Sequence, residues 1–248
     1  MSSLCKLMLG DCLDILPNIP DHSVDLIYAD VPYGTTQCAW DEVIPVKPMW
    51  EQLKRIIKPN GVIALHAAQP FTAVLTCSNL EMFKYEIVWE KGNATGFYNA
   101  KKQPLRAHEH ILIFCDGVGT YNPQMTHGHA RKSSVKKPHK SDVYNVSKVE
   151  TTYDSTSRYP RSVQFFSSDK QKRKRKGINA TRKPVALCEW VIKTYSNEGE
   201  TVMDFCFGSC SSGKASRNTG RNYIGIEKDG TQYLDAISDM NEIDTEAA

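Results

Sequence analysis

Two short apolar runs, far apart in the sequence, constrain the fold most strongly. The run Val24–Ala29 ends in Asp30-Val31-Pro32-Tyr33, and the run Thr201–Phe205 leads into a turn of small residues. A short apolar run bounded by turn residues is typical of a buried strand. In an open parallel sheet, ligands bind at the edge formed by the carboxyl ends of the strands. The sequence therefore predicts two strand ends that face one ligand-binding crevice.

Strands alternate with helices over much of the chain. Apolar residues at helical spacing predict helices at 48–57, 71–77 and 184–195. Apolar runs predict further strands at 62–65, 85–89 and 110–115, and Pro59-Asn60-Gly61 is expected to end the first helix. This alternation predicts an α/β fold with a parallel sheet, and 248 residues suffice for one such domain with an insertion.

Positive charge is concentrated in one part of the chain. The net charge is only +3, but residues 99–183 hold 19 Lys and Arg against 6 Asp and Glu. This segment therefore carries +13, and the rest of the chain carries −10. Such segregation predicts contact with a polyanion, the alternative being a solvated, partly disordered basic insert. The predicted organisation is a first half of the domain at 1–115, a basic loop-rich insertion at 116–181, a second half at 182–240 and a tail at 241–248.

The cysteines and the hydropathy of the sequence indicate the cellular compartment in which we expect the protein. None of the eight cysteines forms a C-x-x-C pair, so no metal site is predicted. The sequence contains no apolar run long enough to cross a bilayer, and its N-terminus lacks the pattern of a signal peptide. We therefore expect reduced thiols, no membrane association and a cytoplasmic location, which for a viral protein means the host cytoplasm.

The turn after Thr201–Phe205 has features of a cofactor site. Gly208 and Gly213 allow the backbone to approach a ligand closely. Glu227 follows Gly208 by 19 residues, at the end of the next predicted strand. Nucleotide-binding folds place an acid about 20 residues beyond the glycines, where it binds ribose hydroxyls. A ribose-bearing cofactor is thus predicted, with an ordinary tight strand–helix turn as the alternative.

The segment that follows Val24–Ala29 suits a planar group with an amine. Pro32 fixes its own φ and favours an extended Val31, which directs the Val31 carbonyl outward beside the Asp30 carboxylate. Two acceptors then converge next to the ring of Tyr33. An aromatic amine would stack on this ring and donate its two hydrogens to the two oxygens.

These motifs, in this order, resemble the circularly permuted β class of S-adenosylmethionine (SAM)-dependent DNA amino-methyltransferases, the N6-adenine and N4-cytosine family. In that family an Asp-Pro-Pro-Tyr motif precedes the target-recognition insertion, and a Phe-x-Gly-x-Gly SAM loop comes last. The corresponding pieces here are Asp30–Tyr33 and Asp204–Gly213. The resemblance implies a permuted Rossmann-like sheet with helices on both faces. It makes 1–115 the catalytic half, 116–181 the target-recognition insertion and 182–240 the SAM-binding half.

The resemblance also implies roles for individual residues. The catalytic set is Asp30, Val31, Pro32 and Tyr33. The SAM-binding set is Asp11, Cys12, Asp30, Lys183, Asp204, Phe205, Cys206, Gly208, Ser209, Cys210, Ser212 and Glu227. The candidates for DNA contact are Lys101, Lys102, Arg106, Arg131, Lys132, Arg158, Arg161, Lys172, Arg173, Lys174 and Arg175.

Two residues depart from the family pattern. Val31 replaces the first proline, but a β-branched residue before Pro32 still prefers the extended conformation, so we expect activity to survive. Cys210 replaces a glycine. If the backbone there has a positive φ, Cys costs on the order of 1 kcal/mol or more. A catalytically degenerate, DNA-binding homologue is therefore one alternative.

The expected function is transfer of a methyl group from SAM to the 6-amino group of a flipped adenine in double-stranded DNA. Asp at the first motif position favours adenine, because the cytosine enzymes more often resemble Ser-Pro-Pro. The alternatives are methylation of the 4-amino group of cytosine and an RNA or protein-amide methyltransferase. A homodimer is one expected assembly, and a restriction-modification system or a phage is the expected setting.

Overall fold

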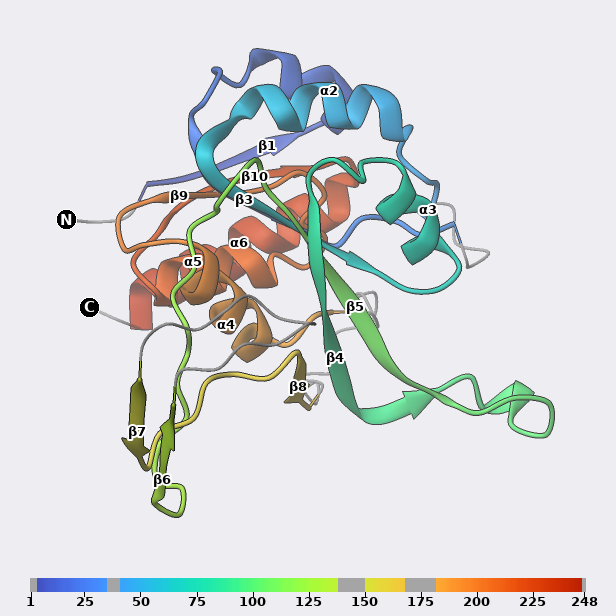
Figure 1. The fold of residues 1–248 in the computed structure, drawn as a ribbon. Coiled ribbons are helices and arrows are strands. Elements are labelled where there is room, and N and C mark those ends of the chain that lie inside the picture. The colour runs from blue at the N-terminus through green and yellow to red at the C-terminus, as the bar shows by residue number, and fades with distance from the viewer. Residues whose placement is uncertain (1–3, 35–40, 138–149, 168–181, 247–248) are drawn as a thin grey trace. The chain divides into compact units, whose positions relative to one another are not determined.

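The computed structural model describes residues 4–34, 41–137, 150–167 and 182–246 (Figure 1). The chain divides into two compact units, a larger one of Met1–Asn122 with Ser162–Ala248 and a smaller one of Pro123–Arg161. The boundaries of the insertion at 116 and 181 remain predictions.

The larger unit is built on an eight-stranded sheet with the order β1-β10-β9-β2-β3-β5-β4-β8. Its strands are β1 (Cys5–Leu9), β2 (Val24–Ala29), β3 (Ile57–Ala67), β4 (Phe83–Thr95), β5 (Arg106–Phe114), β8 (Val163–Phe166), β9 (Thr201–Asp204) and β10 (Asn222–Glu227). The five strands from β1 to β3 in this order are parallel. β5 is antiparallel to both of its neighbours, and β8 is parallel to β4. The α/β prediction is confirmed, but the sheet is mixed rather than wholly parallel.

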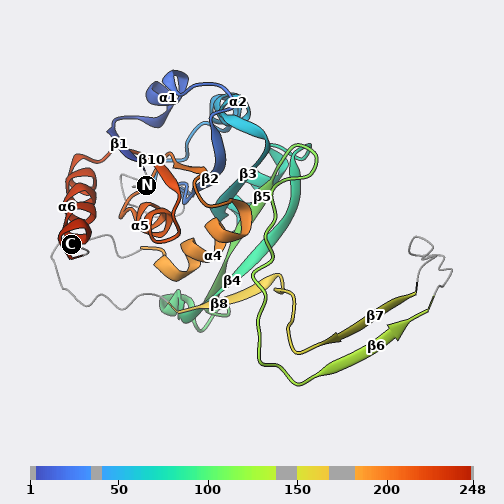
Figure 2. The ribbon, with the colours of Figure 1, turned by 90° about the vertical axis from the view of Figure 1, so that its left-hand side faces the viewer.

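Helices cover both faces of this sheet, as Figures 1 and 2 show. They are α1 (Cys12–Ile15), α2 (Val46–Ile56), α3 (Phe71–Cys77), α4 (Val185–Tyr195), α5 (Ser211–Asn218) and α6 (Gly230–Glu246), with short 3-10 turns η1 (Leu16–Asn18) and η2 (Phe97–Asn99). Successive side chains of a strand point to opposite faces. Ile27 accordingly belongs to the core under α1, α2 and α3, whereas Leu26 belongs to the core under α4, α5 and α6.

Several element boundaries differ from the predictions, although α3 was predicted correctly. α2 ends at Ile56, and β3 begins at Ile57, which already pairs with Val24. Pro59-Asn60-Gly61 therefore lies inside β3, where it forms an irregularity before Val62 pairs with Leu26. The prediction that it separates a helix from a strand was wrong. α6 also continues to Glu246, beyond the residue at which the predicted tail begins.

The segment expected to be loop-rich contains short strands. β8 adds to the edge of the main sheet, where Val88 to Lys91 of β4 pair with Val163 to Phe166. In the smaller unit, β6 (Lys132–Lys136) and β7 (Thr151–Ser155) form an antiparallel pair. Alternating polar and apolar residues over so few positions give too weak a period to predict such strands.

The sheet reverses its direction of winding between β2 and β9. These strands are adjacent and parallel, with Leu26 opposite Val202 and Ile27 opposite Met203. From β9 the chain continues to β10 on one side, whereas from β2 it continues to β3 on the other. Ligands of open α/β sheets bind outside the carboxyl ends of the strands at such a switch point. The residues after Ala29 and after Asp204 lie at this point.

Candidate active site

The loops that follow β2 and β9 are in direct contact. The Cys206 thiol donates a hydrogen bond to the main-chain carbonyl of Asp30, with 3.5 Å between sulfur and oxygen. This contact joins residues 176 positions apart in the sequence. The structure thus brings the Asp-Val-Pro-Tyr segment and the glycine turn to one place, as their positions at adjacent strand ends require.

The Asp30 carboxylate is held by two side chains and stays partly accessible. Its Oδ1 accepts a hydrogen bond from the Tyr33 hydroxyl at 2.7 Å, and its Oδ2 lies 2.6 Å from the Lys183 ammonium. About a third of the side chain, 33%, is exposed. A carboxylate oxygen keeps further lone pairs after one hydrogen bond, so Asp30 is able to accept another donor from a ligand.

The Tyr33 ring is supported from behind. It stacks on Phe71 of α3, with ring centroids 5.8 Å apart and planes inclined by 25°. Asp41, which is buried, accepts hydrogen bonds from the backbone N–H groups of Tyr33 at 2.8 Å and Gly34 at 2.9 Å. Gly34 has a φ of +67°, which favours glycine. Both contacts fix the chain direction immediately after the motif.

Lys183 belongs to a row of alternating charges. Its ammonium also lies 3.2 Å from Glu109 of β5, and Glu109 in turn lies 3.0 Å from Lys91 of β4. Burial raises the pKa of Glu109, but Lys183 and Lys91 outweigh burial and lower it to about 2. Burial lowers the pKa of Lys183, but Asp30 and Glu109 outweigh burial and raise it above its ordinary value. Glu109 and Lys183 are therefore both charged at neutral pH.

A buried histidine lies beside this row. His66 of β3 is 1% exposed, and its Nε2 lies 2.8 Å from the Tyr28 hydroxyl. Its Nδ1 has no hydrogen-bond partner within the part of the chain that the structure describes. Burial, and secondarily the charge of Lys183, lower the pKa of His66 to about 4. A neutral His66 leaves Lys183 as the cation that faces the Asp30 carboxylate.

The turn after β9 is organised by buried carboxylates. Glu227 accepts the backbone N–H of Gly208 at 2.7 Å and that of Asp229 at 2.8 Å. Asp204 accepts the Ser212 hydroxyl at 2.6 Å and the backbone N–H of Cys206 at 3.1 Å. Burial raises the pKa of Asp204 to about 7. Each carboxylate thus holds one end of the loop in place.

Cys210 adopts the conformation that a glycine would favour. Its φ is +55° and its ψ is +34°, in the left-handed region, and its side chain is fully buried. The Cys210 sulfur occupies the space beside Gly213, where an added Cβ would lie only 2.4 Å from it. The sulfur therefore fills a gap at the start of α5, while the backbone bears a strain of roughly 1 kcal/mol.

The N-terminal turn reaches the same side of the sheet. Gly10 donates its backbone N–H to the carbonyl of Glu227 at 2.8 Å. Asp11 caps α1 by accepting the N–H of Leu13 at 2.9 Å, and its other oxygen lies 3.3 Å from Lys228. Burial raises the pKa of Cys12 to about 11, so its thiol is neutral.

Two predicted site residues point into the core. Phe205 is 1% exposed and Val31 is 3% exposed, and both pack in the core under α1, α2 and α3. Their side chains are therefore inaccessible, which leaves only their main-chain atoms to serve a ligand. Ser209, by contrast, is partly exposed, and its hydroxyl lies 3.4 Å from that of Ser211.

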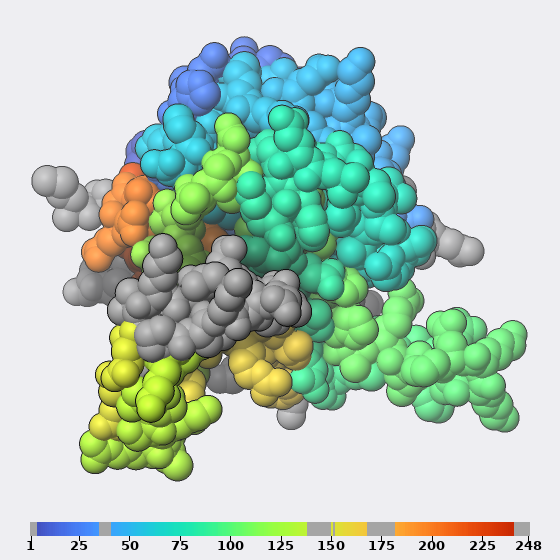
Figure 3. Space-filling view, in the orientation of Figure 1, coloured from blue at the N-terminus to red at the C-terminus, as the bar shows by residue number. Residues whose placement is uncertain are grey.

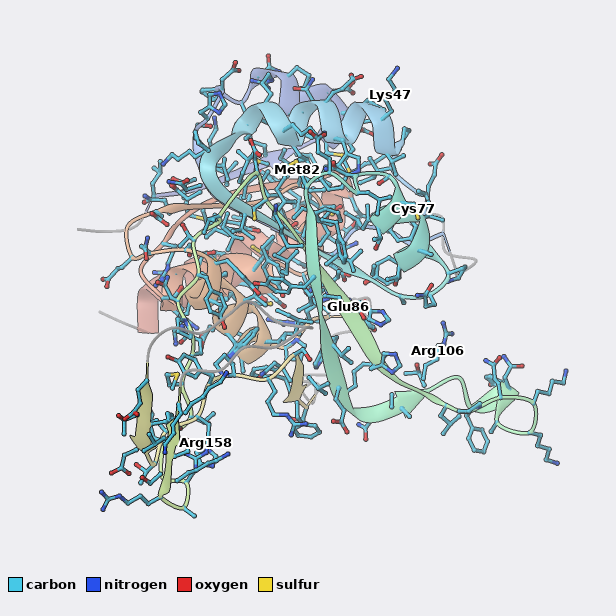
Figure 4. All side chains as sticks on the ribbon, in the orientation of Figure 1. Lys47, Cys77, Met82, Glu86, Arg106 and Arg158 are labelled. Atoms are coloured by element: carbon cyan, nitrogen blue, oxygen red, sulfur yellow. The ribbon has the colours of Figure 1, made fainter. Side chains whose placement is uncertain are left out.

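The predicted DNA-contacting residues fall into three groups. Lys101, Lys102 and Arg106 are exposed on the β4–β5 hairpin, where Figure 4 labels Arg106. Lys132 and Arg161 are exposed in the smaller unit. Arg131 and Arg158 also belong to the smaller unit, whereas Lys172, Arg173, Lys174 and Arg175 lie outside the described residues.

Interactions within the smaller unit hold Arg131 and Arg158. Arg131 forms an ion pair with Asp154, with a shortest nitrogen–oxygen distance of 2.5 Å. Arg158 donates to the carbonyl of Ala130 at 2.6 Å and to that of Ser157 at 2.8 Å, and it also contacts the Tyr153 hydroxyl. Arg158 therefore ties the two sides of this unit together.

Sequence reasoning missed Glu109, Lys91, His66 and Asp41. The first two lie on neighbouring antiparallel strands, and the ion pairs of Glu109 with Lys91 and with Lys183 depend on tertiary structure alone. A weak signal existed for Glu109, because an acid at the start of the apolar run His110–Cys115 is unusual in a buried strand.

Comparison with known proteins identifies the family. Residues 24–238 match the model of the N6_N4_Mtase family, described as DNA methylase. The chain is 29% identical over 255 residues to DNA adenine methyltransferase YhdJ of Escherichia coli (strain K12), which covers 92% of this chain and 82% of that protein. It is 23% identical over 284 residues to type II methyltransferase M1.MboII of Moraxella bovis, which covers 98% and 99%.

Solved structures share the fold. The M1.HpyAVI–SAM complex has a TM-score of 0.63 at 20% identity, covering 95% of this chain and 100% of that one. The cytosine-N4-specific PvuII DNA methyltransferase has a TM-score of 0.69 at 12% identity, covering 96% and 86%. Since the family match spans both strand ends of the crevice and most of the chain, this protein belongs to the N6_N4_Mtase family of DNA methylases.

Proposed function

We propose that the protein transfers a methyl group from SAM to the 6-amino group of an adenine flipped out of double-stranded DNA. The observation that carries this proposal is the contact between Cys206 and Asp30 at the switch point of the sheet. It sets a carboxylate with free acceptor capacity directly beside the glycine turn. A donor site and an acceptor site then share one crevice, as transfer between two bound groups requires.

The glycine turn fits SAM by the chemistry of its residues. Glu227 uses one lone pair of each carboxylate oxygen for Gly208 and Asp229, which leaves acceptors for two ribose hydroxyls. The buried ammonium of Lys183 offers a cation to the carboxylate of SAM. The turn at Gly10 and Asp11 completes the same side of the site. When bound, SAM supplies a methyl group made electrophilic by the sulfonium charge.

The Asp30 side of the crevice prepares the amine. The carboxylate of Asp30 and the carbonyl of Val31 accept the two amine hydrogens, which favours a pyramidal nitrogen and frees its lone pair. Lys183 and the Tyr33 hydroxyl hold the carboxylate in position. The Tyr33 ring, backed by Phe71, stacks on the base. Most of the rate gain comes from this positioning and from the aimed dipoles.

The order of the motifs supports the circularly permuted β class. The Asp30 strand precedes the glycine turn in the sequence, and β1 lies beside β10, the strand that follows that turn. The basic insertion at 116–181 is our candidate for target recognition, with exposed Lys132 and Arg161 as phosphate ligands. The same proposal places the protein with DNA in the cytoplasm, either as a monomer or as a homodimer.

Cytosine is the second candidate target. The PvuII enzyme, which shares the fold, is named as cytosine-N4-specific. Asp30 at the first motif position is the residue that favours adenine in this chain, and YhdJ is named an adenine methyltransferase.

The test uses methyl-labelled SAM and unmethylated genomic DNA, followed by digestion to nucleosides and chromatography. We expect label in 6-methyladenine, and Asp30→Ala should abolish it while calorimetry still measures SAM binding. Label in 4-methylcytosine instead would establish the rival target. Intact SAM binding without label in any base would identify a degenerate homologue.

A further inference from the structure

The hairpin between β4 and β5 carries two consecutive aromatic side chains in solvent. Phe97 is 81% exposed and Tyr98 is fully exposed, with a relative exposure of 103%. Single exposed apolar residues are ordinary on protein surfaces. Two adjacent aromatic rings at the end of a hairpin are a concentrated apolar feature. Figure 3 shows this hairpin, in green, standing clear of the surrounding surface as a lobe.

The tip of the hairpin is a defined structure. Gly96 has a φ of +92° and begins the turn η2. Successive turn hydrogen bonds follow, from Asn99 to Gly96 at 2.9 Å, from Ala100 to Phe97 at 3.0 Å and from Gln103 to Asn99 at 3.0 Å. The backbone that carries the two rings is therefore ordered before any partner binds, which lowers the entropic cost of binding.

The charge around the rings has one sign. Residues 91–106 contain Lys91, Lys101, Lys102 and Arg106 and no Asp or Glu. Lys91 is paired with Glu109 at the base of the hairpin, whereas the other three are exposed. Aromatic rings among cations match a polyanion whose bases offer flat apolar faces.

The hairpin continues directly from the candidate active site. Lys91 and Glu109, which form the row of charges with Lys183, lie on the two strands at its base. Phe97 is six residues beyond Lys91, which at ~3.3 Å per residue spans at most roughly 20 Å, and the irregularity of β4 between Glu90 and Thr95 shortens this span. DNA whose extruded base reaches Asp30 would therefore have its flanking duplex within reach of the tip.

We propose that residues 96–106 form a DNA-binding arm in which Phe97 and Tyr98 pack against base faces of the duplex beside the extruded nucleotide. Lys101, Lys102 and Arg106 bind the adjacent phosphates. Extruding a base leaves neighbouring base pairs with an unstacked face, and apolar wedges are known to occupy opened base steps. This inference rests on the proposed function, because it takes double-stranded DNA as the substrate.

The first experiment measures binding to a duplex of random sequence by the full-length chain, with Phe97→Ala/Tyr98→Ala compared with Leu234→Ala. Leu234 is an exposed residue of α6, 66% exposed, and serves as the matched surface control. We expect the double variant to bind about 5- to 100-fold more weakly, and Leu234→Ala to bind like the parent chain. Equal DNA affinity of the double variant and the control would overturn the proposal that residues 96–106 form a DNA-binding arm.

A second pair of variants separates stacking from charge. Lys101→Gln/Lys102→Gln should lower the slope of log affinity against log salt by roughly 1.8, because about 0.9 is lost per phosphate contact. The control Lys47→Gln/Lys84→Gln removes two other exposed cations and should leave the slope unchanged. The aromatic variant should weaken binding without changing the slope. A change of slope in the aromatic variant, or none in Lys101→Gln/Lys102→Gln, contradicts the assignment.

A third measurement detects the stacking itself. Phe97→Trp should show fluorescence quenching on addition of duplex DNA beyond that of the parent chain, and no extra quenching argues against contact with bases. Methylation by the parent chain is assayed in parallel. If the parent chain binds DNA but shows no methylation, the result counts against the proposed function. The binding data of the variants test the DNA-binding arm separately. If the aromatic variant changed only self-association in sedimentation, a second copy of the chain would be the partner and the proposal would be wrong.

Discussion

The ammonium of Lys183 lies between two carboxylates, 2.6 Å from Oδ2 of Asp30 and 3.2 Å from Oε2 of Glu109. Its side chain is 10% exposed, so the pairs are only weakly screened by solvent. Lys183 therefore connects the proposed catalytic carboxylate to the β4–β5 strands. Its position makes it a positioning residue for Asp30.

Replacing Lys183 by Met should reduce methylation strongly, by about 100-fold, because Asp30 loses the cation that orients it. Leaving two carboxylates without a cation should also lower the free energy of unfolding by up to about 3 kcal/mol. Initial rates with labelled SAM and urea unfolding measure the two effects. Lys214→Met is the matched control, because the Lys214 ammonium pairs with the Asp239 carboxylate at a distance of 2.6 Å and contacts neither Asp30 nor Glu109. It should lose stability but keep the rate, and a rate loss of equal size in both variants would contradict the role of Lys183.

Glu109 should make stability depend on pH in the acid range. Its folded-state pKa of about 2 lies below the ordinary value of 4.5, so its stabilising contribution is fully present above pH 4.5. That contribution is lost as the pH falls from 4.5 towards 2. Glu109→Gln should therefore be less stable than the parent at pH 7, by on the order of 2 kcal/mol, and approach it near pH 2.

Urea unfolding at several pH values measures this difference. Glu81→Gln is the control, because Glu81 faces Lys54 at 3.7 Å with 87% of its side chain exposed and should show no such trend. A constant difference between parent and Glu109→Gln across the acid range would mean that the Glu109 charge is not held by Lys183 and Lys91.

The two functions of Tyr33 can be separated by substitution. Tyr33→Phe removes the hydroxyl that donates to Asp30 but keeps the ring stacked on Phe71, so we expect a rate loss of less than about 10-fold. Tyr33→Ala removes both and should lose about 100-fold, with weaker DNA binding. Steady-state kinetics of the two variants test this order. Tyr233→Phe, which removes a hydroxyl bonded to the Leu7 carbonyl, should behave like the parent, and equal losses in Tyr33→Phe and Tyr33→Ala would exclude a stacking role.

Cys210 allows backbone strain to be measured. Cys210→Ala keeps a Cβ at a φ of +55° and loses the buried sulfur, whereas Cys210→Gly loses the sulfur but relieves the strain. Cys210→Gly should therefore be more stable than Cys210→Ala by about 1 kcal/mol in chemical denaturation. It should also bind SAM at least as well as the parent by calorimetry. Loss of SAM binding in Cys210→Gly would show that the sulfur itself supports the pocket.

Local pattern predicted the parts of the fold that depend on local physics. The strands before Asp30 and Phe205 and the helix Phe71–Cys77 follow from short apolar runs and turn residues. The backbone at Cys210 is left-handed, which is the case in which replacing glycine by cysteine introduces strain. The direction of β5 could not be predicted, because a strand gives the same pattern whether its neighbour is parallel or antiparallel.

Long-range pairing limited prediction of the site in the same way. Lys183 and Asp30 are 153 positions apart, and nothing in either sequence neighbourhood specifies that they form an ion pair. Glu109 and His66 lie on strands that the sequence predicts from their apolar residues. The role of the two polar side chains is apparent only from their proximity to Lys183 in the structure. The catalytic roles assigned by resemblance remain predictions.

The strand β2 pairs with β3 on one side and with β9 on the other. Leu26 of β2 and its partner Val202 of β9 are separated by most of the chain. At a translation speed of roughly 5–20 residues per second, β9 follows β2 from the ribosome by about 10 to 35 seconds. During that interval the nascent polypeptide carries Asp30 at the open flank of an unfinished sheet. The two strand ends that carry Asp30 and the glycine turn can therefore come together only late in synthesis, after β9 has left the ribosome.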